Sequence, residues 1–161
     1  AVHQLMFHAG IQSPEAASPL WLSEGLATAF ETDGTRGAFG PDHEYGPRRA
    51  AFDELLRSDR LLPLDRLVRW DQMPAAGDDE LVHQVYHQGY ALVTWMSRFR
   101  KRELTRFIEL LLVEPGPRIA PERHRELFEQ AFGDVSLLER KWLHHEHDQS
   151  KRTVTLAPRD P

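Results

Sequence analysis

The side chains in this chain that can bind a metal are histidines and carboxylates. The sequence has 161 residues, with nine histidines and no cysteine, so a metal site must be built from His, Asp and Glu. A catalytic zinc site takes three protein ligands and leaves a further position open for water. Two ligands commonly lie one helical turn apart, and the third comes from another helix. His3 fits this pattern as one of the two ligands that lie a turn apart, with its partner expected before Ala1. Glu24 fits it as the ligand from another helix.

Glu24 lies in an otherwise apolar segment, WLSEGLA at residues 21–27. A carboxylate on an apolar helix face is costly to bury unless a cation or a hydrogen-bond donor meets it. A metal ion would satisfy this requirement. The structural alternatives are an ordinary helix-end histidine for His3 and an exposed carboxylate near a helix start for Glu24.

These residues belong to segments that resemble the zinc-binding region of gluzincin metallopeptidases. The segments are AVHQL at residues 1–5 and PLWLSEGLA at residues 19–27. They are similar to peptidase-MA-like domains and, more distantly, to the catalytic domain of the alanyl-aminopeptidase family. In those families an H-E-x-x-H motif precedes a W-L-x-E-G-x-A segment whose Glu is the third ligand. The resemblance implies that His3 and Glu24 bind Zn²⁺, with the first His and the catalytic Glu of the motif preceding Ala1.

Two further segments carry the same resemblance. YHQG at residues 86–89 is similar to the Y-x-K-G motif of the aminopeptidases, with Gln88 in the position of the Lys. It implies that Tyr86 donates a hydrogen bond to the oxyanion formed during hydrolysis. FEQAFGD at residues 128–134, with Leu138 and Trp142, is similar to the helical end of these domains. Thr28, one turn after Glu24, is a candidate partner for a ligand histidine.

The activity implied is zinc-dependent hydrolysis of a peptide or protein substrate by metal-activated water, in the full-length protein. Residues 1–161 alone are expected to be inactive, because two parts of the motif would precede Ala1. The alternative is a catalytically inactive helical domain of the same ancestry that serves as a binding or scaffold module.

Other polar residues offer competing interpretations. His83 and His87 lie one helical turn apart and could bind a metal without hydrolysing anything. The cluster at residues 144–147 (HHEH) is typical of a solvated helix end. Arg48 and Arg49 could hold a substrate carboxylate or lie in solvent, and we favour solvent.

The positions of apolar residues, glycines and prolines predict a mainly α fold. The resemblance implies that this fold is the helical C-terminal part of a thermolysin-like gluzincin domain. We expect an N-terminally truncated domain over residues 1–147 and a polar, frayed tail over residues 148–161. The sequence predicts helices at residues 1–8, from Pro19, and at residues 48–57, 64–69, 80–99, 104–112, 121–132 and 135–147. Gly133 is expected to end a helix, and Asp134 to cap the next one.

Charge and hydropathy exclude two classes of partner. The net charge of −5 lacks the basic surplus typical of nucleic-acid binding. No apolar run approaches the roughly 18–20 residues that a membrane-spanning helix needs.

Overall fold

The computed structural model describes residues 18–30, 44–116 and 118–156, which form seven helices and no strand. The predicted mainly α fold is therefore confirmed. None of these helices is both long and apolar enough to cross a bilayer. The helices are α2 (Leu20–Ala29), α3 (Gly46–Arg57), α4 (Leu64–Val68), α5 (Asp79–Phe99), α6 (Lys101–Leu112), α7 (Pro121–Phe132) and α8 (Val135–Leu156).

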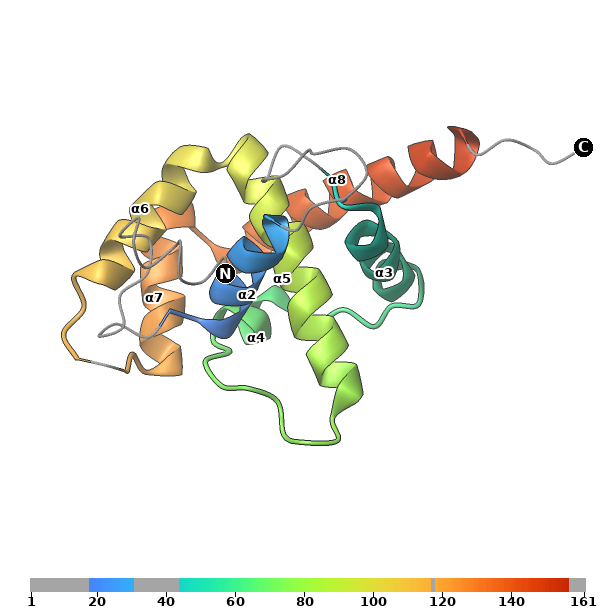
Figure 1. The fold of residues 1–161 in the computed structure, drawn as a ribbon. Coiled ribbons are helices and arrows are strands. Elements are labelled where there is room, and N and C mark those ends of the chain that lie inside the picture. The colour runs from blue at the N-terminus through green and yellow to red at the C-terminus, as the bar shows by residue number, and fades with distance from the viewer. Residues whose placement is uncertain (1–17, 31–43, 117, 157–161) are drawn as a thin grey trace, which may run out of the picture.

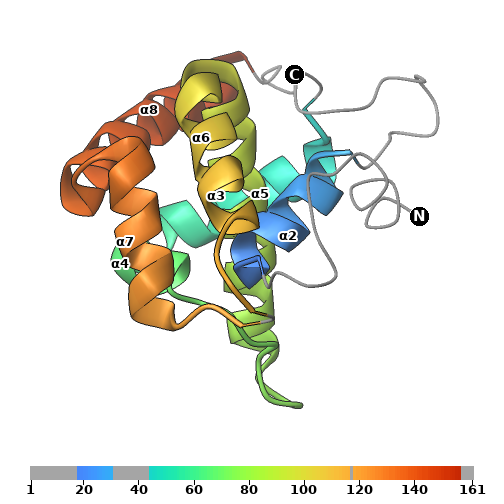
Figure 2. The same cartoon turned by 90° about the vertical axis from the view of Figure 1, so that its left-hand side faces the viewer.

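The long helix α5 runs through the middle of the molecule (Figure 1). Helices α2, α3 and α6 pack against it, and α7 pairs with α6. Figure 2 looks onto the α6–α7 side, where α4 and α8 also contact α7. The second half of α5 is buried almost continuously, from Gln88 to Met96, because neighbouring helices cover it on more than one face.

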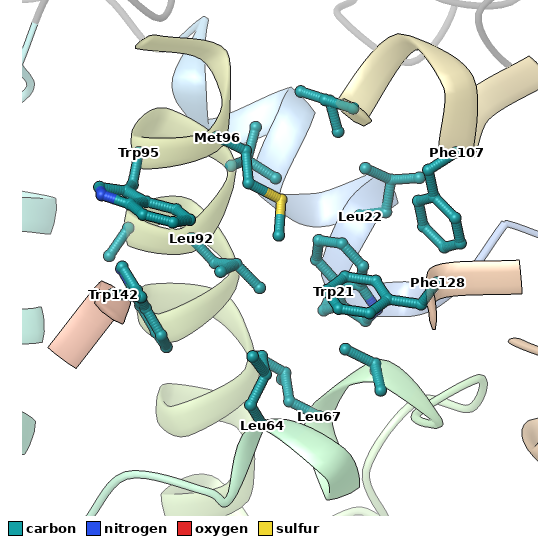
Figure 3. Close-up of a cluster of buried hydrophobic side chains, with 14 of the residues drawn as sticks. Trp21, Leu22, Leu64, Leu67, Leu92, Trp95, Met96, Phe107, Phe128 and Trp142 are labelled. Carbon is teal, nitrogen blue, oxygen red and sulfur yellow. The ribbon is translucent and has the colours of Figure 1, made fainter. Parts of the chain in front are cut away.

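Aromatic rings from helices far apart in the sequence fill the core (Figure 3). Trp21 of α2 is fully buried, stacks on Phe107 of α6 and meets the edge of Phe128 of α7. Phe52 of α3 stacks on Trp142 of α8 in the same core. Burying a large apolar side chain contributes about 1.5–3 kcal/mol, so these contacts fix how the helices pack.

The chain reverses between α7 and α8 where the sequence predicts it. Gly133 follows α7 with a φ of 81°, a conformation that residues with a Cβ adopt only with strain. The carboxylate of Asp134 then accepts a hydrogen bond of 2.7 Å from the amide of Leu137. The predicted helix end and the predicted N-cap are both confirmed.

Helix α8 is longer than predicted, because it continues past His147 to Leu156. Residues 148–156 are mostly polar but contain neither glycine nor proline, and the first proline after His147 is Pro158. Polar residues do not end a helix when no residue breaks its hydrogen bonds. The expected polar tail is therefore helical up to residue 156, and residues 157–161 lie outside the described part of the chain.

An ion pair between α3 and α8 corrects two further expectations. The Glu146 side chain is only 3% exposed and accepts hydrogen bonds from Arg49 Nη1 at 2.6 Å and Trp142 Nε1 at 2.9 Å. Arg49 also pairs with Asp53 at 2.8 Å. Glu146 is thus a buried acceptor within the expected solvated helix end, and Arg49 is a structural cation that does not lie in solvent.

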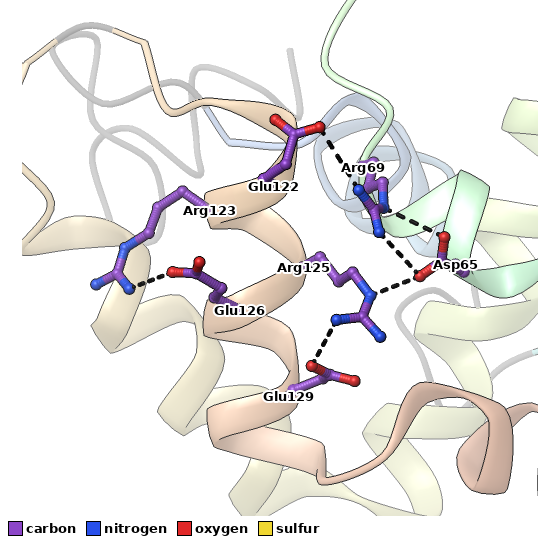
Figure 4. A network of polar contacts seen from close by, with 7 residues as sticks. All are labelled: Asp65, Arg69, Glu122, Arg123, Arg125, Glu126 and Glu129. Carbon is purple, nitrogen blue, oxygen red and sulfur yellow. Dashed lines mark hydrogen bonds and ion pairs between the residues drawn. The ribbon is translucent and has the colours of Figure 1, made fainter.

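A second ionic network joins α4 to α7 (Figure 4). Asp65 accepts from Arg125 at 2.6 Å and from Arg69 at 3.2 Å. Arg125 also pairs with Glu129 at 2.8 Å. Partial burial opposes ionisation of Asp65, but the hydrogen bonds from Arg125 and Arg69 outweigh it and lower the pKa of the carboxyl.

This lowered pKa predicts a pH-dependent contribution to stability. The contribution is present at neutral pH and is lost as the pH falls through the pKa of Asp65 in the folded protein. We expect Asp65→Asn to reduce the free energy of unfolding at pH 7 by about 1 kcal/mol or less, because the side chain is 48% exposed and solvent screens the pairs. The difference from wild type should shrink in urea unfolding at pH 3. Asp71→Asn, at an exposed position, is the control, and a difference that does not depend on pH would contradict the assignment.

Candidate metal centre

The candidate site lies where α2 packs against α5. The start of α2 is fixed by a hydrogen bond of 2.9 Å from the amide of Leu20 to the carbonyl oxygen of Trp70. Glu24 lies in the middle of α2, one residue before the buried Gly25. Tyr86 lies in the first half of α5, one turn before the buried Tyr90. Both Glu24 and Tyr86 are half-buried at the edge of the packed surface.

The structure brings the side chains of Glu24 and Tyr86 together. The Tyr86 hydroxyl lies close enough to the Glu24 carboxylate for the two groups to interact. Burial raises the pKa of the Tyr86 phenol, and the Glu24 carboxylate raises it further. The phenol therefore keeps its proton at neutral pH and remains a hydrogen-bond donor.

A cation from α3 belongs to the same neighbourhood. The amide of Tyr45, just before α3, donates to the hydroxyl of Tyr90 at 2.9 Å, which fixes the start of α3 against α5. The guanidinium of Arg48 lies close enough to Tyr86 to lower the pKa of its phenol, against the larger effects of burial and Glu24. Arg48 is therefore half-buried beside α5, which corrects its expected position in solvent, because no local sequence pattern reveals that the start of α3 lies beside α5.

Thr28 uses its hydroxyl within its own helix. The hydroxyl donates to the backbone carbonyl oxygen of Glu24 at 2.7 Å, and the carbonyl oxygen of Gly25 is a second acceptor at 3.1 Å. Thr28 is buried. Such bonding to the preceding turn is common for threonine in helices. The hydroxyl oxygen keeps acceptor capacity, so its role beside a ligand histidine stays a prediction.

Gln88, in the position of the aminopeptidase lysine, has a structural role here. Its side-chain amide is 1% exposed and bonds both backbone groups of Leu62: the Leu62 amide donates to Oε1 at 2.9 Å, and Nε2 donates to the carbonyl oxygen at 2.6 Å. One turn earlier, Gln84 donates to the carbonyl oxygen of Arg60 at 2.7 Å. The two glutamines therefore hold the loop between α3 and α4 against α5.

The competing pair of histidines lies on α5, in a cleft that Glu24 of α2 does not line. The rings of His83 and His87 are 5.3 Å apart, edge to face, and line a cleft of about 320 Å³ with Glu54 and Glu80. Arg60 pairs with Glu80 at 3.5 Å and with Glu54 at 4.0 Å. Metal binding by the two histidines stays a prediction.

The rest of the predicted zinc site lies outside the described residues. His3 belongs to that part of the chain, so its distance from Glu24 is not described. Across residues 18–30, 44–116 and 118–156, no three His, Asp or Glu side chains are grouped so as to hold a metal ion. Among the predicted ligands only Glu24 is described, and its half-buried carboxylate is of the oxygen type that zinc takes alongside histidine.

Comparison with known proteins assigns the chain to a family. The sequence model of DUF1570, described as a protein of unknown function, matches residues 1–114. Because the match covers more than half of the 161 residues, the chain belongs to this family. The matched segment includes His3, Glu24, Thr28 and Tyr86 and ends just after α6. No curated protein and no solved structure matches the chain.

The role found for Gln88 predicts the effect of restoring the lysine of the aminopeptidase motif. Gln88→Lys should lower the free energy of unfolding by about 2–4 kcal/mol, because it removes two hydrogen bonds and places an ammonium group at a buried position. The control is Gln84→Lys, at the half-buried position one turn earlier, where a lysine can still donate to the carbonyl oxygen of Arg60. Urea unfolding of both variants measures the difference. Equal losses of stability would show that the Gln88 contacts contribute little.

Proposed function

We propose that this protein, in its full-length form, is a zinc-dependent metallopeptidase that hydrolyses peptide bonds with metal-activated water. The observation that supports the proposal most is the proximity of Glu24 on α2 to the Tyr86 hydroxyl on α5. Each residue comes from a different segment of the gluzincin resemblance. A helical module with no catalytic role has no evident need for a half-buried carboxylate and a protonated phenol at the same place.

The ligands in this proposal are His3, Glu24 and a histidine upstream of Ala1. When bound, Zn²⁺ supplies a Lewis acid and a water molecule whose pKa is lowered to about 7. Glu24 is suited to its part because α2 is packed into the core on both sides of it, at Trp21 and Thr28. A side chain on such a rigid element loses little freedom when it binds a ligand.

Tyr86 supplies the hydrogen bond to the reacting carbonyl in this proposal. The carbonyl oxygen of a peptide gains negative charge as water attacks, and a donor placed at that oxygen stabilises the transition state by about 3 kcal/mol. The raised pKa of Tyr86 keeps the hydroxyl protonated for this task. Arg48 adds positive charge to the same neighbourhood, which favours a developing oxyanion.

The zinc content of the purified full-length protein tests the ligand assignment. We expect about one zinc ion per wild-type chain and none after Glu24→Ala, because two histidines alone bind zinc weakly. His83→Ala is the matched control and should retain zinc. Loss of zinc in His83→Ala, together with retention of zinc in Glu24→Ala, would assign the metal site to His83 and His87 on α5. A wild-type protein free of zinc would favour the inactive binding module.

The rate of peptide hydrolysis by the full-length protein tests the role of Tyr86. Tyr86→Phe should lower kcat about 100-fold with the zinc content unchanged, because it removes an oxyanion donor and no ligand. Tyr45→Phe serves as the control and should retain most of the activity, because Tyr45 contacts Tyr90 through its backbone amide, which this change leaves in place. An unchanged kcat for Tyr86→Phe would assign that residue to packing.

A further inference from the structure

Helices α2 and α5 cross at two glycines that approach each other with no side chain between them. A Cβ on Gly25 would lie 2.6 Å from the carbonyl oxygen of Gly89 and 2.7 Å from Cγ2 of Val93. A Cβ on Gly89 would lie 2.8 Å from the carbonyl oxygen of Trp21. Contacts this short are essentially never seen for a real Cβ, so any other residue at either position would push the helices apart.

The close approach is the reason for glycine at both positions. Gly25 and Gly89 lie inside regular helices, where neither adopts a positive φ. Glycine in a helix interior costs about 1 kcal/mol relative to alanine. The distance between the axes of two packed helices depends on the side chains at their contact. A glycine on each helix allows the shortest distance between the axes.

These glycines adjoin the two residues of the candidate site. Gly25 directly follows Glu24, and Gly89 lies three positions after Tyr86 on the same helix. We propose that Gly25 and Gly89 are positioning residues whose close contact holds the Glu24 carboxylate beside the Tyr86 hydroxyl. The consequence for catalysis rests on the proposed function, whereas the positioning itself does not require zinc.

Small movements of α2 are enough to break this arrangement. A methyl group on Gly89 would meet backbone atoms of Trp21, which cannot rotate away as a flexible side chain can. Trp21 is itself fixed in the core by Phe107 and Phe128. Polar contacts between side chains weaken steeply with distance, so a displacement of α2 at the crossing weakens the Glu24–Tyr86 contact.

A double-mutant cycle measures this contact without any metal. The free energy of unfolding in urea is determined for Glu24→Ala, Tyr86→Phe and the double variant of the full-length protein. The cycle is run in the wild-type background and again with Gly89→Ala. We expect a coupling of about five-fold in the unfolding equilibrium constant in the wild-type background, falling to within two-fold of no coupling with Gly89→Ala.

Gly46→Ala is the matched control for the change from glycine to alanine. Gly46 opens α3, and a Cβ there would meet nothing within 4 Å, so the Glu24–Tyr86 coupling should be unchanged in that background. Val93→Ile is a milder wedge at the crossing for use if Gly89→Ala does not fold. It should reduce the coupling, because the Val93 side chain already faces Gly25.

The outcomes separate the positioning inference from the proposed function. A coupling that persists in the Gly89→Ala background, or in the Val93→Ile background where that variant is needed, overturns the positioning role. Absence of coupling in the wild-type background overturns it as well. A wild-type protein that shows the coupling but binds no zinc refutes the metallopeptidase proposal and leaves the positioning role of the glycines intact.

Discussion

The contact between α2 and α5, made with no side chain between their backbones at Gly25 and Gly89, determines much of this structure. It brings Trp21 deep enough into the molecule to meet the rings contributed by α6 and α7. It also places the polar edge of α2 beside the first half of α5, where Glu24 meets Tyr86. One close helix crossing thus organises the aromatic core on one side and the candidate site on the other.

The order and approximate limits of the described helices could be predicted from the sequence, because local residues set them. Gly133 and Asp134 end one helix and begin the next through their own backbone and side-chain chemistry. The predicted end of α8 at His147 is wrong, because polar residues alone do not end a helix. No glycine or proline lies between His147 and Pro158. The buried partnership of Arg49 with Glu146 joins residues 97 positions apart, and periodicity carries no information about such a pair.

The candidate site was only partly predictable for the same reason. The resemblance singled out Glu24 and Tyr86, but their spacing in the sequence gives no sign that they meet. The meaning of Gln88 also depended on tertiary structure, because its amide bonds the backbone of Leu62 in a loop that lies 26 positions earlier. The role of Gln88 therefore follows from the packing of this loop on α5, which the sequence pattern does not reveal.

The chemistry of a phenol explains how one side chain can serve both the observed contact and the proposed reaction. A tyrosine hydroxyl has a single proton to donate, and in this structure the Glu24 carboxylate is an acceptor beside it. Transfer of the hydrogen bond to a substrate carbonyl oxygen changes the acceptor and leaves the protonation state of Tyr86 as it was. The phenol then needs only to be rigidly placed and to remain protonated. Packing of α5 against α2 provides the first condition, and burial beside a carboxylate provides the second.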